Sequence, residues 1–153
     1  MTRLLITGVP GTGKSTLGDH LDKAHGFRHV DMEQNVTCIA FLQDPEKFVL
    51  SLSEPVVITW GFRPVPDRNR ILFLKQHQYF LVWMDGNRWA SLRAFLQRDT
   101  VEEIAYYFQL FNIEQSRIIE QIQPHAIINP FQTDGSFRPT SDVANEVLSL
   151  SSA

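Results

Sequence analysis

RLLITGVPGTGKST, residues 3–16, is the stretch of sequence that decides the fold of this chain. Residues 3–7 form an apolar run, which predicts a strand buried on both faces of a parallel sheet. A glycine-rich turn follows, and the helical spacing of the next leucines predicts a helix over 13–24. Residues 8–15 match G-x-x-x-x-G-K-[ST] at every fixed position. In this strand–turn–helix context the pattern indicates a phosphate-binding loop.

Each fixed position of this phosphate loop (residues 8–15) has a chemical reason. Gly8, Gly11 and Gly13 allow the positive φ angles that turn successive backbone N–H groups inward. Lys14 supplies a cation for the β- and γ-phosphates, and the hydroxyl of Ser15 is a ligand for Mg²⁺. The expected cofactors are therefore ATP and Mg²⁺. The residues predicted to bind the nucleotide are Gly8, Gly11, Thr12, Gly13, Lys14, Ser15 and Thr16.

Composition limits the other functions that the chain can have. The 153 residues suit one domain over 1–153, and a formal charge of −3 gives no footprint for nucleic-acid binding. The longest apolar runs, 56–60 and 80–84, are too short to span a membrane. Cys38 is the single cysteine, so no intrachain disulfide forms. We expect a soluble, cytoplasmic protein with no signal peptide and no nucleic-acid or membrane partner.

The rest of the chain alternates predicted strands and helices. Further strands are predicted over 27–31, 55–60, 79–84 and 126–128. Helices are predicted over 35–42, 45–52, 67–76, 87–97, 101–122 and 141–150, with loops over 63–66 and 130–139. Asp67 is the expected cap of its helix, and capping boxes over 100–103 and 112–115 place a start near 101 and a break near 112. This alternation predicts a three-layer α/β/α sandwich around a five-stranded parallel sheet.

Two carboxylates lie at the end of the second predicted strand: Asp31 is its last residue, and Glu33 follows two residues later. In an open parallel sheet, ligands bind beyond the carboxyl ends of the strands, where the phosphate loop also lies. These acids can hold Mg²⁺ through water, or one of them can accept the proton of an attacking hydroxyl. The alternative is structural: Asp31 caps the next helix and Glu33 is a first-turn acid.

The chain resembles the P-loop small-molecule kinases, a group that includes nucleoside-monophosphate, shikimate and gluconate kinases. Asp31-Met32-Glu33 is similar to the D-x-D of shikimate-kinase-like enzymes, which implies that Asp31 contacts Mg²⁺ and the acceptor and that Glu33 binds the acceptor. Gly61-Phe62-Arg63-Pro64 is similar to the G-F-P-R of adenylate kinases, with Arg and Pro exchanged, and implies that Arg63 binds substrate. The Asp usual before this glycine is replaced by Trp60, which shifts the expected metal contact to Asp31.

Two arginines near the end of the helix after the fourth strand complete the predicted site. The resemblance implies that arginines here stack on adenine or reach the transferring phosphate from a lid. Arg98 is predicted to neutralise charge on the γ-phosphate, and Arg93 is predicted to bind the nucleotide. A solvated helix face is the alternative for Arg93.

Together these residues predict a kinase that moves the γ-phosphoryl group of ATP to a small molecule, with Lys14, Asp31 and Arg98 as the catalytic residues. A carboxylate base favours a hydroxyl acceptor over a nucleoside monophosphate. The alternatives are a nucleotide switch or slow NTPase that acts through a partner protein, and an ATP-binding protein without catalysis. The chain has no D-x-x-G after the loop and no N-K-x-D to read guanine, which disfavours a Ras-like GTPase.

Overall fold

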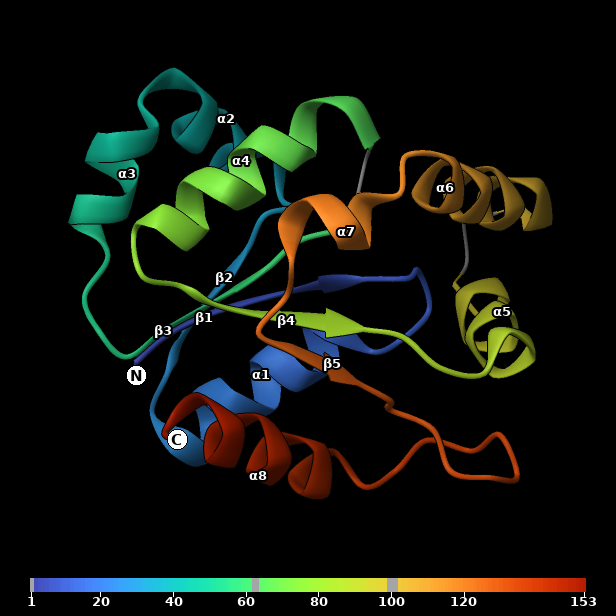
Figure 1. Cartoon of the computed structure of the whole chain (residues 1–153). Helices are drawn as coiled ribbons and strands as arrows, with labels where there is room; N and C mark the ends of the chain where they lie inside the picture. Colours follow the sequence, from blue (N-terminus) through green and yellow to red (C-terminus); the bar gives the residue numbers. More distant parts are fainter. Residues whose placement is uncertain (1, 62–63, 99–101) are drawn as a thin grey trace.

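The computed structural model describes residues 2–61, 64–98 and 102–153. Within these residues, five strands form one parallel sheet in the order β2-β3-β1-β4-β5 (Figure 1). The strands are β1 (Arg3–Gly8), β2 (Arg28–Asp31), β3 (Val56–Thr59), β4 (Phe80–Met84) and β5 (Ala126–Ile128). The sheet confirms the predicted five-stranded parallel α/β fold. Because β1 lies at its centre, between β3 and β4, the phosphate loop starts from the middle of the sheet.

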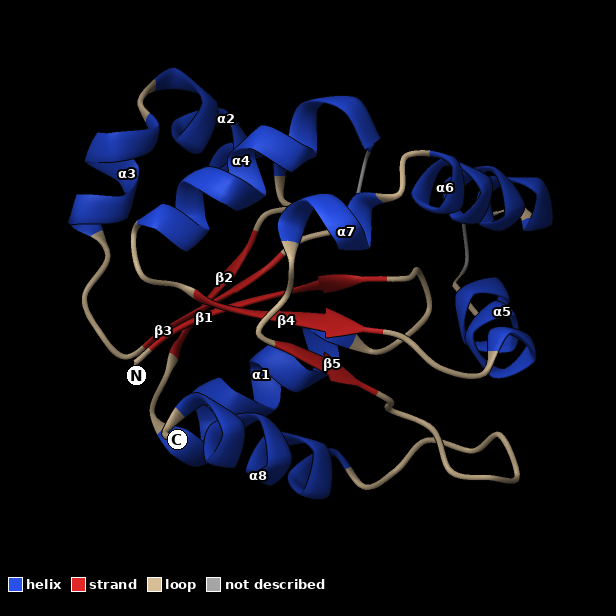
Figure 2. Cartoon of the chain, in the orientation of Figure 1, coloured by secondary structure: helices blue, strands red, loops and turns tan. Residues whose placement is uncertain are grey.

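Helices cover both faces of this sheet. They are α1 (Lys14–His25), α2 (Asn35–Gln43), α3 (Pro45–Ser51), α4 (Pro64–Gln76), α5 (Arg88–Leu96), α6 (Glu103–Gln115), α7 (Ile118–Ile122) and α8 (Thr140–Ser151). Figure 2 shows α1 and α8 below the sheet and α2, α3, α4 and α7 above it. The three predicted layers are therefore present. Within the described residues, no helix combines the length and apolarity needed to cross a bilayer.

The alternation of side chains along β1 builds a separate core on each face of the sheet. Leu5 points to the side of α4 and α7, where it joins a core that includes Trp83. Leu4 and Ile6 point to the side of α1 and α8, in a core with Leu17. All three β1 side chains are fully buried. Burial on both faces explains why residues 3–7 read as an apolar run without alternation.

Helix α4 begins earlier than the sequence indicates. The predicted loop over 63–66 and the predicted cap at Asp67 are wrong for the part that is described, because α4 already starts at Pro64. Proline fits the first turn of a helix, since the N–H that it lacks has no partner there. Asp67 lies inside that first turn, is buried, and pairs with Arg70 at 3.1 Å. Residue 63 lies outside the described residues.

The break in the long helical stretch also differs from the prediction. Helix α6 continues through Asn112 to Gln115, and the chain turns at Arg117, whose φ is 51°. Ile118 and Ile122 then join the core that contains Leu5 and Trp83. The position of the break is therefore set by tertiary packing and not by the capping pattern at 112–115. Of the other predicted capping box, residues 100 and 101 lie outside the described residues, and the N-cap of α6 is Glu102.

The carboxyl ends of the strands gather the parts of the predicted site. Helices α5 and α6 lie beyond this edge of the sheet (Figure 1). Val9 of the phosphate loop packs there in a small third core with Leu92 and Phe95 of α5 and Tyr106 of α6. The loop is thus held between the sheet and the α5–α6 pair.

Candidate functional site

The phosphate loop has the backbone that its glycines predict. Gly8, Gly11 and Gly13 have φ angles of 138°, 75° and 79°, all in the region that favours glycine. Close packing adds a second constraint at the first two positions. A methyl group on Gly8 would overlap the backbone of Met84, and one on Gly11 would overlap the carbonyl oxygen of Ser91. Glycine is therefore required in this loop both by conformation and by space.

Lys14 lies folded inside this loop and not extended into solvent. Its Nζ donates a hydrogen bond to the carbonyl oxygen of Val9 at 2.9 Å, and the hydroxyl of Thr12 donates to the same oxygen at 2.8 Å. The pKa of Lys14 is lowered to about 8, mainly because the amine is buried; Glu33 opposes this shift, and Arg98 adds a smaller contribution in the same direction as burial. A buried ammonium with a lowered pKa gains stability from a bound anion. The loop and its lysine therefore fit a polyphosphate.

A cavity of about 420 Å³ opens in front of Lys14. It joins three of the predicted site residues, Lys14, Glu33 and Arg98, which come from separate elements. The guanidinium of Arg98 lies 5.3 Å from the ring centre of Phe95, which holds it at the wall of the cavity. The other lining residues are Gly8, Pro10, Gly61, Glu102, Ala105 and Gln109. We call this space the Lys14 cavity.

Asp31, the last residue of β2, and Glu33 line different cavities. The carboxylate of Glu33 lies over Gly61, where it lines the Lys14 cavity. Asp31 instead lines a cavity of about 480 Å³ together with Ser15, which we call the Ser15 cavity. Asp31 Oδ1 accepts a hydrogen bond from the backbone N–H of Glu33 at 2.9 Å. The N-cap of α2 is Gln34, so Asp31 orders the turn before that helix without capping it.

The described residues contain no ready-made cluster of three or more metal-binding side chains. Mg²⁺ usually binds proteins through one or two ligands and takes the rest from phosphate and water. Ser15 and Asp31 are a hydroxyl and a carboxylate that share one cavity next to the phosphate loop. They are suitable donors for Mg²⁺ beside a bound triphosphate.

A smaller cavity of about 180 Å³ lies on the other side of the loop, toward α8. Thr12, Gly13 and Thr16 form one wall, and Phe137 and Arg138 from the segment after β5 form the other. Sequence reasoning missed Phe137. The available signal was an aromatic residue in the predicted loop 130–139, but residue type alone does not show that its ring lies near Gly13.

Arg93 lies apart from Lys14. It lines a separate cavity of about 380 Å³ with Asp134, Gly135 and Phe137. The Ser136 hydroxyl and backbone N–H hold the pKa of Asp134 below its usual range, and Arg93 lowers it further. Arg93 therefore lies beside the segment after β5. Phe137 of that segment lines both this cavity and the cavity of about 180 Å³ next to Gly13. Arg63, the other predicted substrate contact, lies outside the described residues.

His29 organises the floor of the Ser15 cavity, a role that its sequence context did not indicate. One ring nitrogen, Nδ1, is 2.8 Å from Asp19 Oδ1, and the other, Nε2, is 2.8 Å from Thr59 Oγ1. The ring fills the space that a side chain at Gly18 would need. His29, a residue of β2, thereby connects α1 with β3 and lines the same cavity as Asp31.

Comparison with known proteins identifies the fold. No model of a protein family matches the sequence, and neither does any curated protein. Among solved structures, the chain is similar to shikimate kinase from Bacteroides thetaiotaomicron, with a TM-score of 0.65, 17% identity and 99% of each chain covered. It is similar to shikimate kinase from Acinetobacter baumannii in complex with shikimate, with a TM-score of 0.66, 20% identity, and 98% of this chain and 92% of that chain covered. It is also similar to a gluconokinase from Sinorhizobium meliloti 1021, with a TM-score of 0.64, 15% identity, and 99% of this chain and 92% of that chain covered. The chain thus has the fold of the P-loop small-molecule kinases, as the sequence resemblance implies.

Proposed function

We propose that this protein is a Mg²⁺- and ATP-dependent phosphotransferase that moves the γ-phosphoryl group to a hydroxyl of a small molecule. The observation that carries the proposal is the Lys14 cavity, in which the loop lysine, Arg98 and Glu33 meet. Phosphoryl transfer is catalysed mainly by positioning and by stabilising charge on the transferred group. Two cations, Lys14 and Arg98, and the carboxylate of Glu33 would supply both, while a second carboxylate, Glu102, also lines the cavity.

The nucleotide would lie along the phosphate loop. The loop amides and Lys14 would hold the β- and γ-phosphates, as positive-φ glycine turns do before a helix N-terminus. The cavity between Gly13 and Phe137 is a suitable place for the base, because an aromatic ring and apolar walls exclude water from a planar ligand. Arg93, beside the same segment, is our candidate for a further nucleotide contact.

We assign Mg²⁺ to Ser15 and Asp31. Bound there, the ion would neutralise charge that develops between the β- and γ-phosphates. Asp31, in the Ser15 cavity, is also our candidate catalytic acid–base residue, and Glu33, which lines the Lys14 cavity, is our candidate for acceptor binding. Arg98 would contact the transferring phosphate from the opposite wall.

The charge of the Lys14 cavity supports a hydroxyl acceptor over a phosphorylated one. Glu33 and Glu102 both line it, and two carboxylates disfavour an acceptor that already carries a phosphate dianion. A neighbouring cavity of about 360 Å³ shares Glu33, Gly61 and Gln109 and extends to Asn35 and Cys38. Met32 and Trp60 line this second cavity as well, so the shared residues suggest one acceptor site whose far end has uncharged and largely apolar walls.

An acceptor screen tests this function. ADP release from Mg²⁺-ATP is measured with panels of sugar acids, sugars, nucleosides and nucleoside monophosphates. We expect one class of alcohol to stimulate release. If no acceptor does, and hydrolysis is slow or absent, the kinase proposal is wrong, and a nucleotide switch or a binding protein without catalysis takes its place.

Paired variants then separate the two acids. Asp31→Asn should lower turnover by roughly 10²- to 10⁴-fold with little change in ATP affinity, because it removes a group that acts on the reaction. Glu33→Gln should mainly raise the acceptor KM. Asp22→Asn and Glu102→Gln remove acids from the same two cavities and serve as matched controls. Equal effects of Asp31→Asn and Asp22→Asn would contradict a specific role for Asp31.

A further inference from the structure

The cavity that we assign to the nucleotide base, between Gly13 and Phe137, has mainly apolar walls. Met84 and Val143 line it together with Phe137. The Phe137 ring packs against the buried ring of Phe131, with the ring centres 4.8 Å apart, so its position is supported by the protein. We call this space the base cavity. Its polar groups decide whether one base can be told from another.

Arg138 is the only charged residue among the described residues that line the base cavity, and its guanidinium is already engaged. Its Nη1 donates a hydrogen bond to the carbonyl oxygen of Asn129 at 2.8 Å, and its Nη2 pairs with Glu146 of α8 at 2.7 Å. An arginine that reads a base points both of these nitrogens at the base edge. Arg138 instead fastens the segment after β5 to α8.

Backbone groups of the lining residues are engaged in the same way. The carbonyl oxygen of Pro130 accepts a hydrogen bond from the backbone N–H of Arg138 at 2.8 Å. The carbonyl oxygen of Phe137 accepts one from Nε2 of Gln132 at 3.3 Å. These groups hold the segment after β5 in its own fold, so reading a base with them would require giving up bonds within the protein.

The other polar side chains that line the base cavity are threonines. The hydroxyl of Thr12 donates to the carbonyl oxygen of Val9 at 2.8 Å. The hydroxyls of Thr16 and Thr140 can each donate or accept a hydrogen bond. Adenine presents an amino group where guanine presents an oxygen, and a hydroxyl can pair with either. Threonine therefore gives no preference between the two purines.

We propose that the base is held by stacking and apolar contact without hydrogen-bond readout, so that this protein takes purine nucleoside triphosphates in general as phosphoryl donors. The inference rests on the proposed function and names the class of donor that the same site accepts. Stacking on an aromatic ring is tolerant of base identity, because every base has a π-face. Strong discrimination needs a polar group that the wrong base leaves unpaired.

Affinities of the wild-type protein test this inference. Isothermal titration calorimetry with Mg²⁺ gives the Kd values of ATP, GTP, ITP and inorganic tripolyphosphate. We expect the three nucleotides to agree within about tenfold, and tripolyphosphate, which has no base, to bind at least about tenfold more weakly than any of them.

The possible failures are distinguishable. A difference larger than about tenfold between purines means that the base is read, and it overturns the inference while the proposed kinase function stands. Tripolyphosphate that binds as tightly as the nucleotides also overturns it, since the base then contributes nothing. If none of the four ligands binds, the proposed function fails as well.

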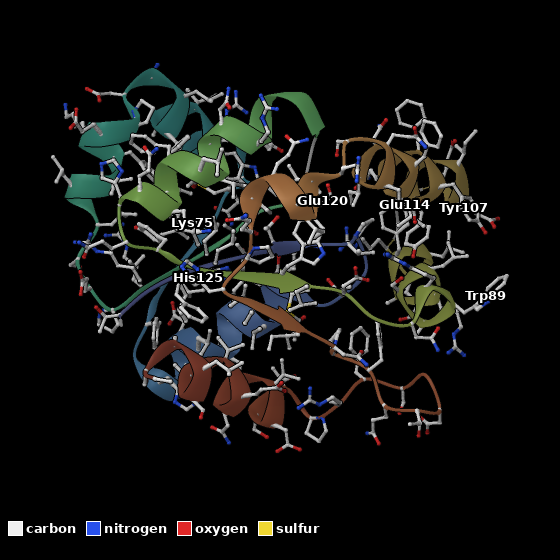
Figure 3. The ribbon with its side chains drawn as sticks, in the orientation of Figure 1. Lys75, Trp89, Tyr107, Glu114, Glu120 and His125 are labelled. Atoms are coloured by element: carbon white, nitrogen blue, oxygen red, sulfur yellow. The ribbon has the colours of Figure 1, made fainter. Side chains whose placement is uncertain are left out.

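Phe137 and Tyr107 provide a matched pair of variants. Their side chains are 47% and 46% exposed, and Figure 3 shows Tyr107 pointing away from the sheet on α6. Phe137→Ala should weaken ATP, GTP and ITP by a common factor of roughly five- to a hundredfold and leave tripolyphosphate unchanged. Tyr107→Ala should change none of the four affinities.

Phe137→Leu guards against misfolding, because it removes the stacking ring but keeps an apolar side chain beside Phe131. It should show the same pattern as Phe137→Ala, with circular dichroism and thermal melting confirming that each variant is folded. In a folded variant, a loss confined to one purine, an equal loss for tripolyphosphate or no loss at all overturns the inference. So does an equal loss in Tyr107→Ala.

Discussion

The phosphate loop and the wall that faces it across the Lys14 cavity are built in different ways. The loop is eight consecutive residues whose shape comes from backbone angles at three glycines. The facing wall comes from several places in the chain: Glu33 after β2, Gly61 after β3, Arg98 after α5, and Ala105 and Gln109 on α6. A site made from the backbone is encoded locally, whereas a site made from side chains depends on how distant elements pack.

This difference predicts that single substitutions act most strongly in the loop. Gly11→Ala should lower the free energy of unfolding by on the order of 3 to 5 kcal/mol, because it adds strain at a positive φ and an overlap with Ser91. Gly26→Ala is the matched control: its φ of 71° is similar, but open space surrounds the position. It should cost only about 1 kcal/mol. Urea unfolding measures both, and equal losses would mean that close packing adds nothing to the requirement for glycine.

The lowered pKa of Lys14 predicts how pH affects nucleotide affinity. Phosphate binds the protonated amine, and a pKa of about 8 leaves most Lys14 side chains charged at pH 7 and few charged at pH 9. The affinity for ATP should therefore fall by about tenfold between those pH values. Titration of a fluorescent ATP analogue at each pH measures the change. Lys14→Arg keeps its charge throughout and should give a flat profile; a slope as steep as the wild type's would assign the pH effect to another group.

The hydrogen bonds of Tyr106 test how firmly the facing wall is held. Its hydroxyl contacts the Ser91 hydroxyl and the Arg88 carbonyl oxygen, and these bonds join α6 to α5. Tyr106→Phe should cost about 1 kcal/mol of stability, the usual value of a buried neutral hydrogen bond. Tyr107→Phe, next in sequence and exposed, should cost much less in the same unfolding assay. If the two variants are equally stable, the bonds to α5 do not fix α6.

The smallest expected effect is electrostatic: two charged side chains of the facing wall change the pKa of Lys14 in the loop. Glu33 raises the pKa of Lys14 and Arg98 lowers it, both as minor contributions beside burial. Glu33→Gln should therefore move the midpoint of the pH profile for ATP binding downward, and Arg98→Gln should move it upward. Shifts in the same direction would show that these two groups do not act on Lys14 through their charges.

The sequence predicted the parallel sheet and the loop well because both depend on short-range patterns. The helix limits around α4 and α6 were less predictable, since Pro64 is compatible with a loop or a first helical turn. The end of α6 is set by Ile118 and Ile122 entering the core, a contact with no local signature. For the same reason, no spacing rule in the sequence could predict that Asp31 and Glu33 line different cavities. Nor could one predict that the ring of Phe137 lies near Gly13.

The central position of β1 has a consequence for how the protein matures. The phosphate-loop residues precede β4 in the chain, yet Gly8 lies against Met84 and Val9 donates its N–H to the Met84 carbonyl oxygen at 3.0 Å. A nascent chain that ends before β4 holds the motif without its support. Ligand binding should thus report that β4 has already assembled beside β1, and a saturating ligand should protect the folded domain against heat.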